Sequence, residues 1–263
     1  TPHGHYEYLV MPQGHRSAAC HFSRMVYEIF EDMRDKGRCF TVYQDDTTNH
    51  ETDFLKHMQV QQESYAIMRR KKLLYKASKA HLNFKTQRIL GHIVSKDGRA
   101  IDPKRIEAIT QLAPPRDEKG IRSFMGLVQH LRDYIPNLAS VSEPITRLMR
   151  KGVDVPSRWG KEQDDAFAEL KRLLTTAPVL RMYNPNAKCR IVVDTCKIER
   201  GIGAALLQVD TEWYEKTKEE VWRPVAYWSR ALTASERNYC ATLLECIGMH
   251  DAILHWAVYV RNG

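Results

Sequence analysis

Two neighbouring aspartates at the end of an apolar run constrain the fold more than any other feature of the sequence. The run Cys39-Phe40-Thr41-Val42-Tyr43 has the composition of a strand, and Gln44-Asp45-Asp46 follows it directly. Like charges side by side repel each other, so Asp45 and Asp46 cannot both be buried core residues. The strand must therefore end at a surface, with its carboxylates in water or beside cations.

The residues alone leave two interpretations of this pair open. A solvated turn explains an Asp-Asp dipeptide without any function, and the dipeptide by itself favours it. Alternatively, carboxylates at a strand end can hold two divalent cations roughly 3.5–4 Å apart, one activating an oxygen nucleophile and one stabilising the leaving group. This second interpretation predicts phosphoryl-transfer chemistry.

Composition narrows the class of protein. The chain has 263 residues, of which 43% are hydrophobic and 27% charged, as in globular domains, and this length predicts about two of them. No apolar stretch approaches the roughly 20 residues of a membrane helix. The net charge of +8 permits a polyanionic partner. The six cysteines lack CxxC spacing, so we expect reduced, mostly buried thiols in a cytoplasmic or nuclear protein.

Apolar spacing predicts the elements of the first part of the chain. Residues 6–11 are typical of a strand, and residues 17–36 have helical spacing that ends at Gly37. Residues 50–75 predict a helix, and residues 89–94 predict one further strand. The apolar side of that helix would carry Phe54, Leu55, Met58, Tyr65 and Met68.

The rest of the chain predicts helices followed by a strand-rich region. Asp102 is a favourable N-cap, with Pro103 in the first turn. Further helices are predicted around residues 121–131 and 166–174. Three strands follow, at residues 189–194, 201–208 and 225–229. A long helix from residue 235 would bury Leu244, Ile247, Met249, Ile253 and Leu254.

Several motifs resemble those of the reverse transcriptases of gypsy-type LTR retrotransposons, and they occur in the same order along the chain. Tyr43-Gln44-Asp45-Asp46 is similar to the family's Tyr-x-Asp-Asp hairpin, and the segment from Tyr6 to Met11-Pro12-Gln13-Gly14 is similar to the one before it. Lys79 resembles a lysine beside the nucleotide site, although Ala80 replaces the following Cys. Leu90-Gly91-His92 resembles the primer grip. Residues 121–127, 134–137 and 143–148 resemble the thumb and connection.

The last part of the chain resembles the RNase H domain of such polyproteins. Asp194 stands at the family's first catalytic Asp, residues 201–208 are similar to the following strand, and Glu245 falls on the catalytic Glu. An acid at a strand end and one in the first turns of a helix can converge on one metal site. Without the resemblance, a surface helix position would be the favoured interpretation of Glu245.

The resemblance implies an α+β (α/β) fold in three parts. Residues 1–95 would be a partial reverse transcriptase palm and residues 96–182 a helical thumb and connection. Residues 183–263 would be a partial RNase H-like domain with a mixed sheet.

The implied activity is RNA-directed DNA polymerisation with RNase H activity, by two-metal nucleotidyl transfer with Mg²⁺ or Mn²⁺. The catalytic and metal-binding residues would be Asp45, Asp46, Asp194 and Glu245. The nucleotide-binding residues would be Gln13, Gly14, Tyr43 and Lys79. The nucleic-acid-binding residues would be Gly91, His92, Lys104, Arg105, Arg122 and Arg132. Implied partners are an RNA/DNA hybrid or primer-template, deoxynucleoside triphosphates and the remainder of the pol polyprotein, with no membrane.

Departures from the family pattern limit the activity that we expect. The family's palm uses an upstream Asp, and its RNase H site uses further acids; the chain runs from Thr1 to Gly263 without these motifs. Thr47-Thr48-Asn49-His50 replaces an apolar returning strand, which predicts a weakened hairpin. We therefore expect this fragment to be inactive in isolation. A non-catalytic nucleic-acid-binding remnant is the main alternative, and an unfolded or untranslated relic is another.

Overall fold

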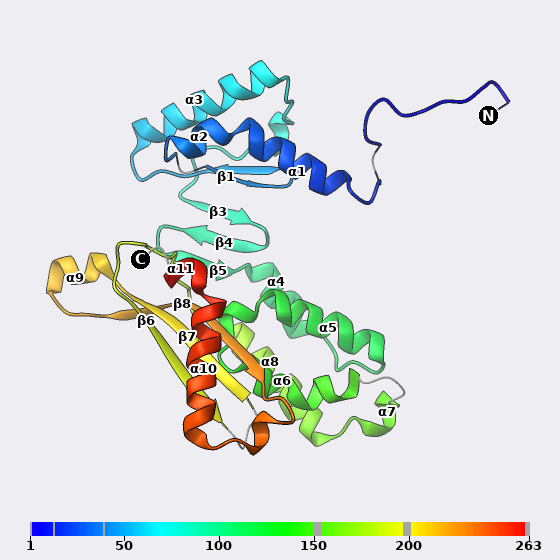
Figure 1. Ribbon diagram of the computed structural model, residues 1–263, viewed down its shortest axis with the longest axis vertical. Helices are drawn as coiled ribbons and strands as arrows, with labels where there is room; N and C mark the ends of the chain where they lie inside the picture. Colours follow the sequence, from blue (N-terminus) through cyan, green and yellow to red (C-terminus); the bar gives the residue numbers. More distant parts are fainter. Residues whose placement is uncertain (1, 13, 39, 150–153, 197–200, 261–263) are drawn as a thin grey trace. The chain divides into compact units, whose positions relative to one another are not determined.

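The computed structural model describes residues 2–12, 14–38, 40–149, 154–196 and 201–260 (Figure 1). The chain divides into two compact units, Thr1–Leu82 and Asn83–Gly263. Helices and antiparallel sheets occur in both, which confirms the predicted α+β class. Within the described residues, no helix combines the length and the apolar character needed to cross a membrane.

Three helices supply most of the core of the first unit. They are α1 (Ala18–Ile29), α2 (Glu31–Asp35) and α3 (Phe54–Lys71). The predicted helix over residues 17–36 is confirmed as the consecutive helices α1 and α2, and Gly37 follows them in the left-handed region at φ 66°. The buried core residues are Val26, Phe30, Met33, Phe40, Val60 and Ile67.

A hairpin completes the first unit. Strand β1 (Phe40–Tyr43) pairs antiparallel with β2 (Asp46–Asn49), so that Tyr43 lies opposite Asp46 and Gln44-Asp45 form the turn. Gln44 has φ 52°, the conformation that a two-residue turn of this kind requires. The polar returning strand therefore does form, although its side chains are only half-buried.

The predicted strand at residues 6–11 is wrong. This segment has no strand partner in the described part of the chain, and Tyr8 and Leu9 are 81% and 91% exposed. An alternating sequence alone does not make a strand, because the ladder hydrogen bonds come from a neighbouring segment.

The predicted apolar side of α3 is confirmed only in part: Met68 packs against the core, but Leu55 and Tyr65 are exposed. The residues buried on this helix are Val60, Gln61, Ser64 and Ile67, whereas Phe54 is 63% exposed. The Ser64 hydroxyl donates to the Gln61 carbonyl at 2.8 Å, so the buried face tolerates polar residues whose hydrogen bonds are local. Counting apolar residues therefore misplaced the buried face.

The second unit begins with a three-stranded sheet. Its strands are β3 (Thr86–Ile89), β4 (His92–Ser95) and β5 (Gly98–Ile101), antiparallel in that order. The single strand predicted over residues 89–94 is wrong, because Leu90 and Gly91 have φ 49° and 80° and form a two-residue turn. A glycine at the second turn position was the signal for this hairpin.

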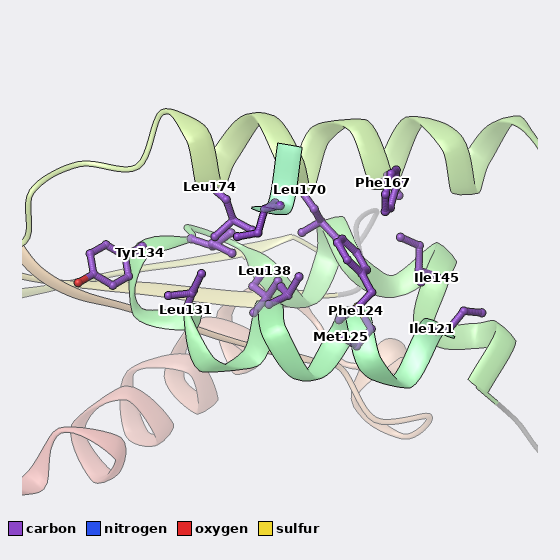
Figure 2. Packing of buried hydrophobic residues seen from close by; sticks show 14 of the residues in the cluster. Ile121, Phe124, Met125, Leu131, Tyr134, Leu138, Ile145, Phe167, Leu170 and Leu174 are labelled. Atoms are coloured by element: carbon purple, nitrogen blue, oxygen red, sulfur yellow. The ribbon is translucent and has the colours of Figure 1, made fainter. Parts of the chain in front are cut away.

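Helices build the largest core of the second unit. They are α4 (Pro103–Gln111), α5 (Glu118–His130), α6 (Leu138–Thr146), α7 (Val155–Arg158) and α8 (Lys161–Thr175), with short 3₁₀ turns η2 (Arg132–Tyr134) and η3 (Arg147–Met149). Figure 2 shows side chains of α5 and α8 pointing toward one another. The rings of Phe124 and Phe167 lie 4.8 Å apart between centroids. The helices predicted around residues 121–131 and 166–174 are confirmed.

A second three-stranded sheet follows. Strands β6 (Cys189–Cys196), β7 (Gly201–Val209) and β8 (Trp222–Ala231) lie where three strands were predicted, and α9 (Thr211–Thr217) joins the last two. They pair antiparallel in that order, whereas the expectation was a mixed sheet. The helix predicted from residue 235 begins at Ala241 as α10 (Ala241–His255), after a 3₁₀ turn η4 (Glu236–Asn238) and before α11 (Ala257–Val260). Of its predicted buried residues, Leu244 is buried, but Met249, Ile253 and Leu254 are exposed.

Helices cover both faces of this sheet. On one face Ala139 of α6 donates its backbone N–H to the Ser229 hydroxyl of β8 at 2.9 Å. On the other face α10 packs through Gly248 against Val193 and Thr195 of β6. The helical and strand-rich regions thus share one compact unit, and the domain boundaries at residues 95/96 and 182/183 stay predictions.

The prediction of mostly buried thiols is wrong for the described cysteines. Cys20, Cys189, Cys240 and Cys246 are exposed, and Cys196 is half-buried. Their apolar neighbours in sequence take the inward positions instead, as Leu244 does beside Cys246 on α10.

Candidate functional site

The hairpin of the first unit holds Asp45 and Asp46 at its tip. Asp45 is in the turn, Asp46 is the first residue of β2, and both side chains are exposed. Tyr43 lies opposite Asp46 and is 53% exposed. The backbone thus presents two carboxylates and a phenol ring next to one another at the surface, as the sequence predicted for residues 43–46.

A cleft of about 640 Å³ lies beside the hairpin tip. Its walls come from the segment before α1, from α1 itself and from the turn residues Gln44 and Asp45. Gly14 lines it with φ 84°, a left-handed conformation that favours glycine. Gln13, predicted to bind nucleotide, lies outside the described residues. The lining residues are Met11, Pro12, Gly14, Ala18, Ala19, His21, Phe22, Met25, Gln44 and Asp45.

Sequence reasoning missed Tyr75, which fastens the returning strand of the hairpin. Its hydroxyl forms a hydrogen bond of 2.7 Å with the Thr47 hydroxyl. Burial raises the pKa of Tyr75, and the negative charges of Asp46 and Asp45 raise it further. Because Thr47 directly follows Asp46 in β2, this hydrogen bond holds the Tyr75 hydroxyl near the tip of the hairpin. No local pattern marks such a residue, because its partner is 28 positions away.

The donor set at the hairpin suits a hard divalent cation. Mg²⁺ takes one or two carboxylates from a protein and completes its shell with water and substrate phosphates. Asp45 and Asp46 supply that number. The described residues contain no group of three or more His, Cys, Asp or Glu side chains arranged to hold a metal. The pair can therefore share a cation with a phosphate ligand, whereas no closed protein cage surrounds it.

Asp194 and Glu245 are not brought together. Asp194 is exposed on β6 and pairs with Gly203, whose side faces Asn137 and therefore the α6 face of the sheet. Successive strand residues point to opposite faces, and Val193 and Thr195 face α10. Glu245 is exposed on α10. The strand carboxylate thus points away from the helix that carries its predicted partner.

The β3–β4 turn presents Gly91 and His92. The Tyr134 hydroxyl and His92 Nδ1 form a hydrogen bond of 3.0 Å, and the His92 ring stacks on those of Tyr134 and His130, at 5.6 and 5.5 Å between centroids. Burial lowers the pKa of His92, as does the positive charge of Arg99. Burial raises the pKa of Tyr134 to about 12, so its hydroxyl keeps its proton. The sequence did not single out Tyr134 for this role.

The predicted basic contacts differ in their surroundings. Lys104 is exposed on the first turn of α4, while the Arg105 guanidinium packs against Gly91. Arg122 pairs with Glu118 at 2.5 Å and is 64% exposed; Arg132 is 3.9 Å from Asp133 and 55% exposed. Lys79 is exposed at the end of the 3₁₀ turn η1 (Ala77–Lys79). All except Arg105 are exposed to solvent, although Arg122 and Arg132 already have acidic neighbours.

Comparison with known proteins defines the class to which these features belong. The family described as reverse transcriptase (RNA-dependent DNA polymerase) matches residues 1–94, and the RNase H-like domain found in reverse transcriptase matches residues 159–263. The protein thus combines reverse transcriptase and RNase H-like domains.

Relatives identify the kind of element. The Transposon Tf2-3 polyprotein of Schizosaccharomyces pombe is 26% identical over 261 residues, which is 99% of this chain and 19% of that protein; the Tf2-7 polyprotein of the same organism is 25% identical over the same span. The chain thus matches reverse transcriptase and RNase H-like family models and is similar over almost its whole length to retrotransposon polyproteins, which confirms the resemblance seen in the sequence. It spans about a fifth of the length of these relatives.

Solved structures share the fold. A foamy viral protease-reverse transcriptase (dRH) in complex with double-stranded DNA has a TM-score of 0.80 and 18% identity, covering 94% of this chain and 41% of that one. A foamy viral protease-reverse transcriptase with an RNA/DNA hybrid has a TM-score of 0.77 and 18% identity, covering 94% and 32%.

Proposed function

We propose that this chain is part of an RNA-directed DNA polymerase and that Asp45 and Asp46 bind Mg²⁺ or Mn²⁺ in its palm. The position of Asp45 carries the proposal. It lies at the tip of a hairpin and lines a cleft that is also lined by Pro12 and Gly14. The bound cation would neutralise phosphate charge during nucleotidyl transfer.

The cleft and its surroundings form the proposed nucleotide site. Gly14 would let a substrate approach the backbone closely, because it carries no side chain. Gln13 and Tyr43 would flank the nucleotide, and the Lys79 ammonium would meet the triphosphate as a point charge. Each residue contributes binding or orientation, while deoxynucleoside triphosphates are the proposed substrates.

The second unit would hold the nucleic acid. The proposed contacts to an RNA/DNA hybrid or primer-template are Gly91 in the β3–β4 turn, His92 at the start of β4, Lys104, Arg122 and Arg132. The fold neighbours whose titles describe complexes with double-stranded DNA and an RNA/DNA hybrid support this class of partner. The remainder of a pol polyprotein is the proposed protein partner, as the relatives are polyproteins.

A second candidate function, hybrid binding without catalysis, is favoured by the RNase H-like domain. Asp194 and Glu245 are the proposed metal ligands there, but the strand carboxylate faces away from α10 and two separated acids would bind a cation weakly. We infer that this fragment binds hybrid without cleaving it. The exposed free thiols of Cys20, Cys189, Cys240 and Cys246 support a reducing, cytoplasmic or nuclear compartment.

Primer extension tests whether the fragment polymerises DNA by itself. Wild-type chain and Asp45→Asn are compared on a poly(rA) template with an oligo(dT) primer, with Mg²⁺ or Mn²⁺. We expect no extension by the 263-residue chain alone, and extension above the level of the mutant would show that the fragment is a polymerase.

Hybrid binding over a salt series tests the nucleic-acid function independently. We expect affinity to fall steeply as salt rises, because each neutralised phosphate releases counterions, with a log–log slope of about −0.9 per contact. Affinity that is indifferent to salt, or no binding at low salt, would refute the proposed partner.

A further inference from the structure

The β3–β4 turn rests on the side chain of Arg105. A Cβ built on Gly91 would overlap the Arg105 guanidinium, so only glycine lets the guanidinium lie directly against the backbone of the turn. Arg105 is half-buried in α4, whereas the adjacent Lys104 is exposed. We expected both residues to contact nucleic acid, but their surroundings separate them.

The conformation of the Leu90-Gly91 turn has to be stabilised by neighbouring residues. Leu90 and Gly91 both have positive φ, 49° and 80°, and a leucine adopts this left-handed conformation only at a cost. Residues held in such a conformation persist where the surrounding structure over-determines it. The pair Ile89–His92 is the last rung of the β3–β4 ladder before the turn. The Arg105 guanidinium supports the turn residues themselves through its contact with Gly91.

The position of Arg105 is itself fixed by contacts at the start of α4. The Asp102 side chain caps α4 by accepting from the Lys104 backbone N–H at 3.0 Å, and the same carboxylate pairs with Arg88 of β3 at 2.7 Å. Asp102 is 5% exposed. The first turn of α4 is thus bound to the strand that enters the hairpin, which fixes the distance between Arg105 and the turn.

The guanidinium is poorly placed to bind a phosphate. Its Nη1 is buried and has no hydrogen-bond partner within the described residues. A phosphate bound from solvent would reach Lys104 without rearrangement, whereas Nη1 of Arg105 is buried and its Nη2 and Nε lie against Gly91. The planar group therefore acts through packing against Gly91, a role that an ammonium cannot copy.

We propose that Arg105 is a positioning residue that holds the Leu90-Gly91 turn in its nucleic-acid-binding shape without itself contacting phosphate. The assignment rests on the proposed function of the β3–β4 turn. It distinguishes two adjacent basic residues that a charge count treats alike.

The salt dependence of hybrid binding by the full chain tests this assignment. Lys104→Met should reduce the magnitude of the log–log slope by about 1, because it removes a phosphate contact. Arg105→Met should weaken binding by roughly three- to tenfold at every salt concentration and leave the slope unchanged. Arg105→Lys keeps the charge but should weaken binding as Arg105→Met does. A slope reduced in Arg105→Met as in Lys104→Met, or wild-type affinity in Arg105→Lys, would overturn the proposal.

Hydrogen exchange of the same unliganded proteins supplies an independent measurement. Arg105→Met should speed exchange in peptides that cover residues 86–101, and Lys104→Met should leave it unchanged. Equal exchange in the wild type and Arg105→Met would overturn the positioning role. If the wild type fails to bind hybrid, the proposed function fails, and the exchange comparison alone decides whether Arg105 holds the turn.

Discussion

Arg230 joins three segments of the RNase H-like domain through charged hydrogen bonds. From β8 its Nη1 donates to Glu236 in η4 at 2.8 Å, and its Nε donates to Asp251 on α10 at 2.7 Å. The three side chains are 27%, 13% and 25% exposed, so water screens them only in part. Both carboxylates hold the pKa of Arg230 above its ordinary value, led by the hydrogen bond to Glu236. Arg230 thus ties the end of the sheet to the helix that covers it.

This network makes stability depend on pH in acid. The hydrogen bond from Arg230 lowers the pKa of Glu236 to about 2, below its ordinary value of 4.5. A depressed carboxyl pKa contributes stability that is complete above pH 4.5 and is lost as pH falls toward 2. Glu236→Gln should lower the free energy of unfolding by about 1.5–3 kcal/mol at pH 7 and flatten its pH dependence between 4.5 and 2.5.

Urea unfolding at several pH values measures this effect, with Glu215→Gln at an exposed position of α9 as the control. An equal loss of stability on acidification in the wild type and Glu236→Gln would contradict the assignment.

Single residues were predictable where the signal is local. Asp102 and Pro103 mark a helix start that the structure confirms, because capping involves only the next few backbone groups. Tyr75 and Tyr134 were missed, since their hydrogen-bond partners lie 28 and 42 positions away. The tip residues Asp45 and Asp46 were predictable together, whereas the facing of Asp194 depended on strand register.

At the scale of elements, the approach of α10 to β6 depends on Gly248. A Cβ at this position would lie 2.8 Å from Val193 Cγ1 and 3.0 Å from Thr195 Cγ2. Gly248→Ala should therefore destabilise the protein by about 1–3 kcal/mol, because the helix must move off the sheet.

Gly126→Ala in α5 is the matched control. A Cβ there would meet nothing within 4 Å, so the substitution should stabilise by about 0.5–1 kcal/mol through helix propensity. Thermal unfolding of both variants checks the pair of predictions. Equal effects at the two positions would show that the close approach at Gly248 does not matter.

Elements were predictable from spacing more often than their faces. Most helices and the three strands of the last sheet form where their periodicity indicated. The strand predicted at residues 6–11 does not form, because this segment has no ladder partner among the described residues. The buried face of α3 differs from the predicted one, because local hydrogen bonds allow Gln61 and Ser64 to be buried. Neither outcome can be predicted from the sequence of the element alone.

At the scale of the whole molecule, the two units have cores of different extent. Among its described residues, the first has a core cluster of six buried side chains, from α1, α2, α3, β1 and the junction between α1 and α2. The second has one large core cluster, whose buried residues lie between Ile101 and Leu180 in the sequence, and further buried residues at the last sheet. Which sheet and which helices share a unit was not predictable, because contacts far apart in sequence decide it.

Native-state hydrogen exchange of the full chain should reflect this difference. We expect the most protected amides of residues 14–82 to exchange faster than those of α5 and α8, since few buried apolar contacts mean a low free energy of local unfolding. Mass spectrometry of peptides from both units provides the measurement. Equal maximal protection in the two units would mean that they unfold as one.

The bridge between Arg99 and Leu180 sets an order of events during translation. Each donates its backbone N–H to the carbonyl of the other, at 2.7 and 2.9 Å, and Gly98 has no side chain that would meet the Leu180 carbonyl. A ribosome adding about 5–20 residues per second makes Leu180 about 4–16 s after Arg99. During that interval the edge of β5 has no partner from this segment. A nascent chain therefore exposes this edge for seconds, and an unpaired strand edge of this kind can pair with other chains.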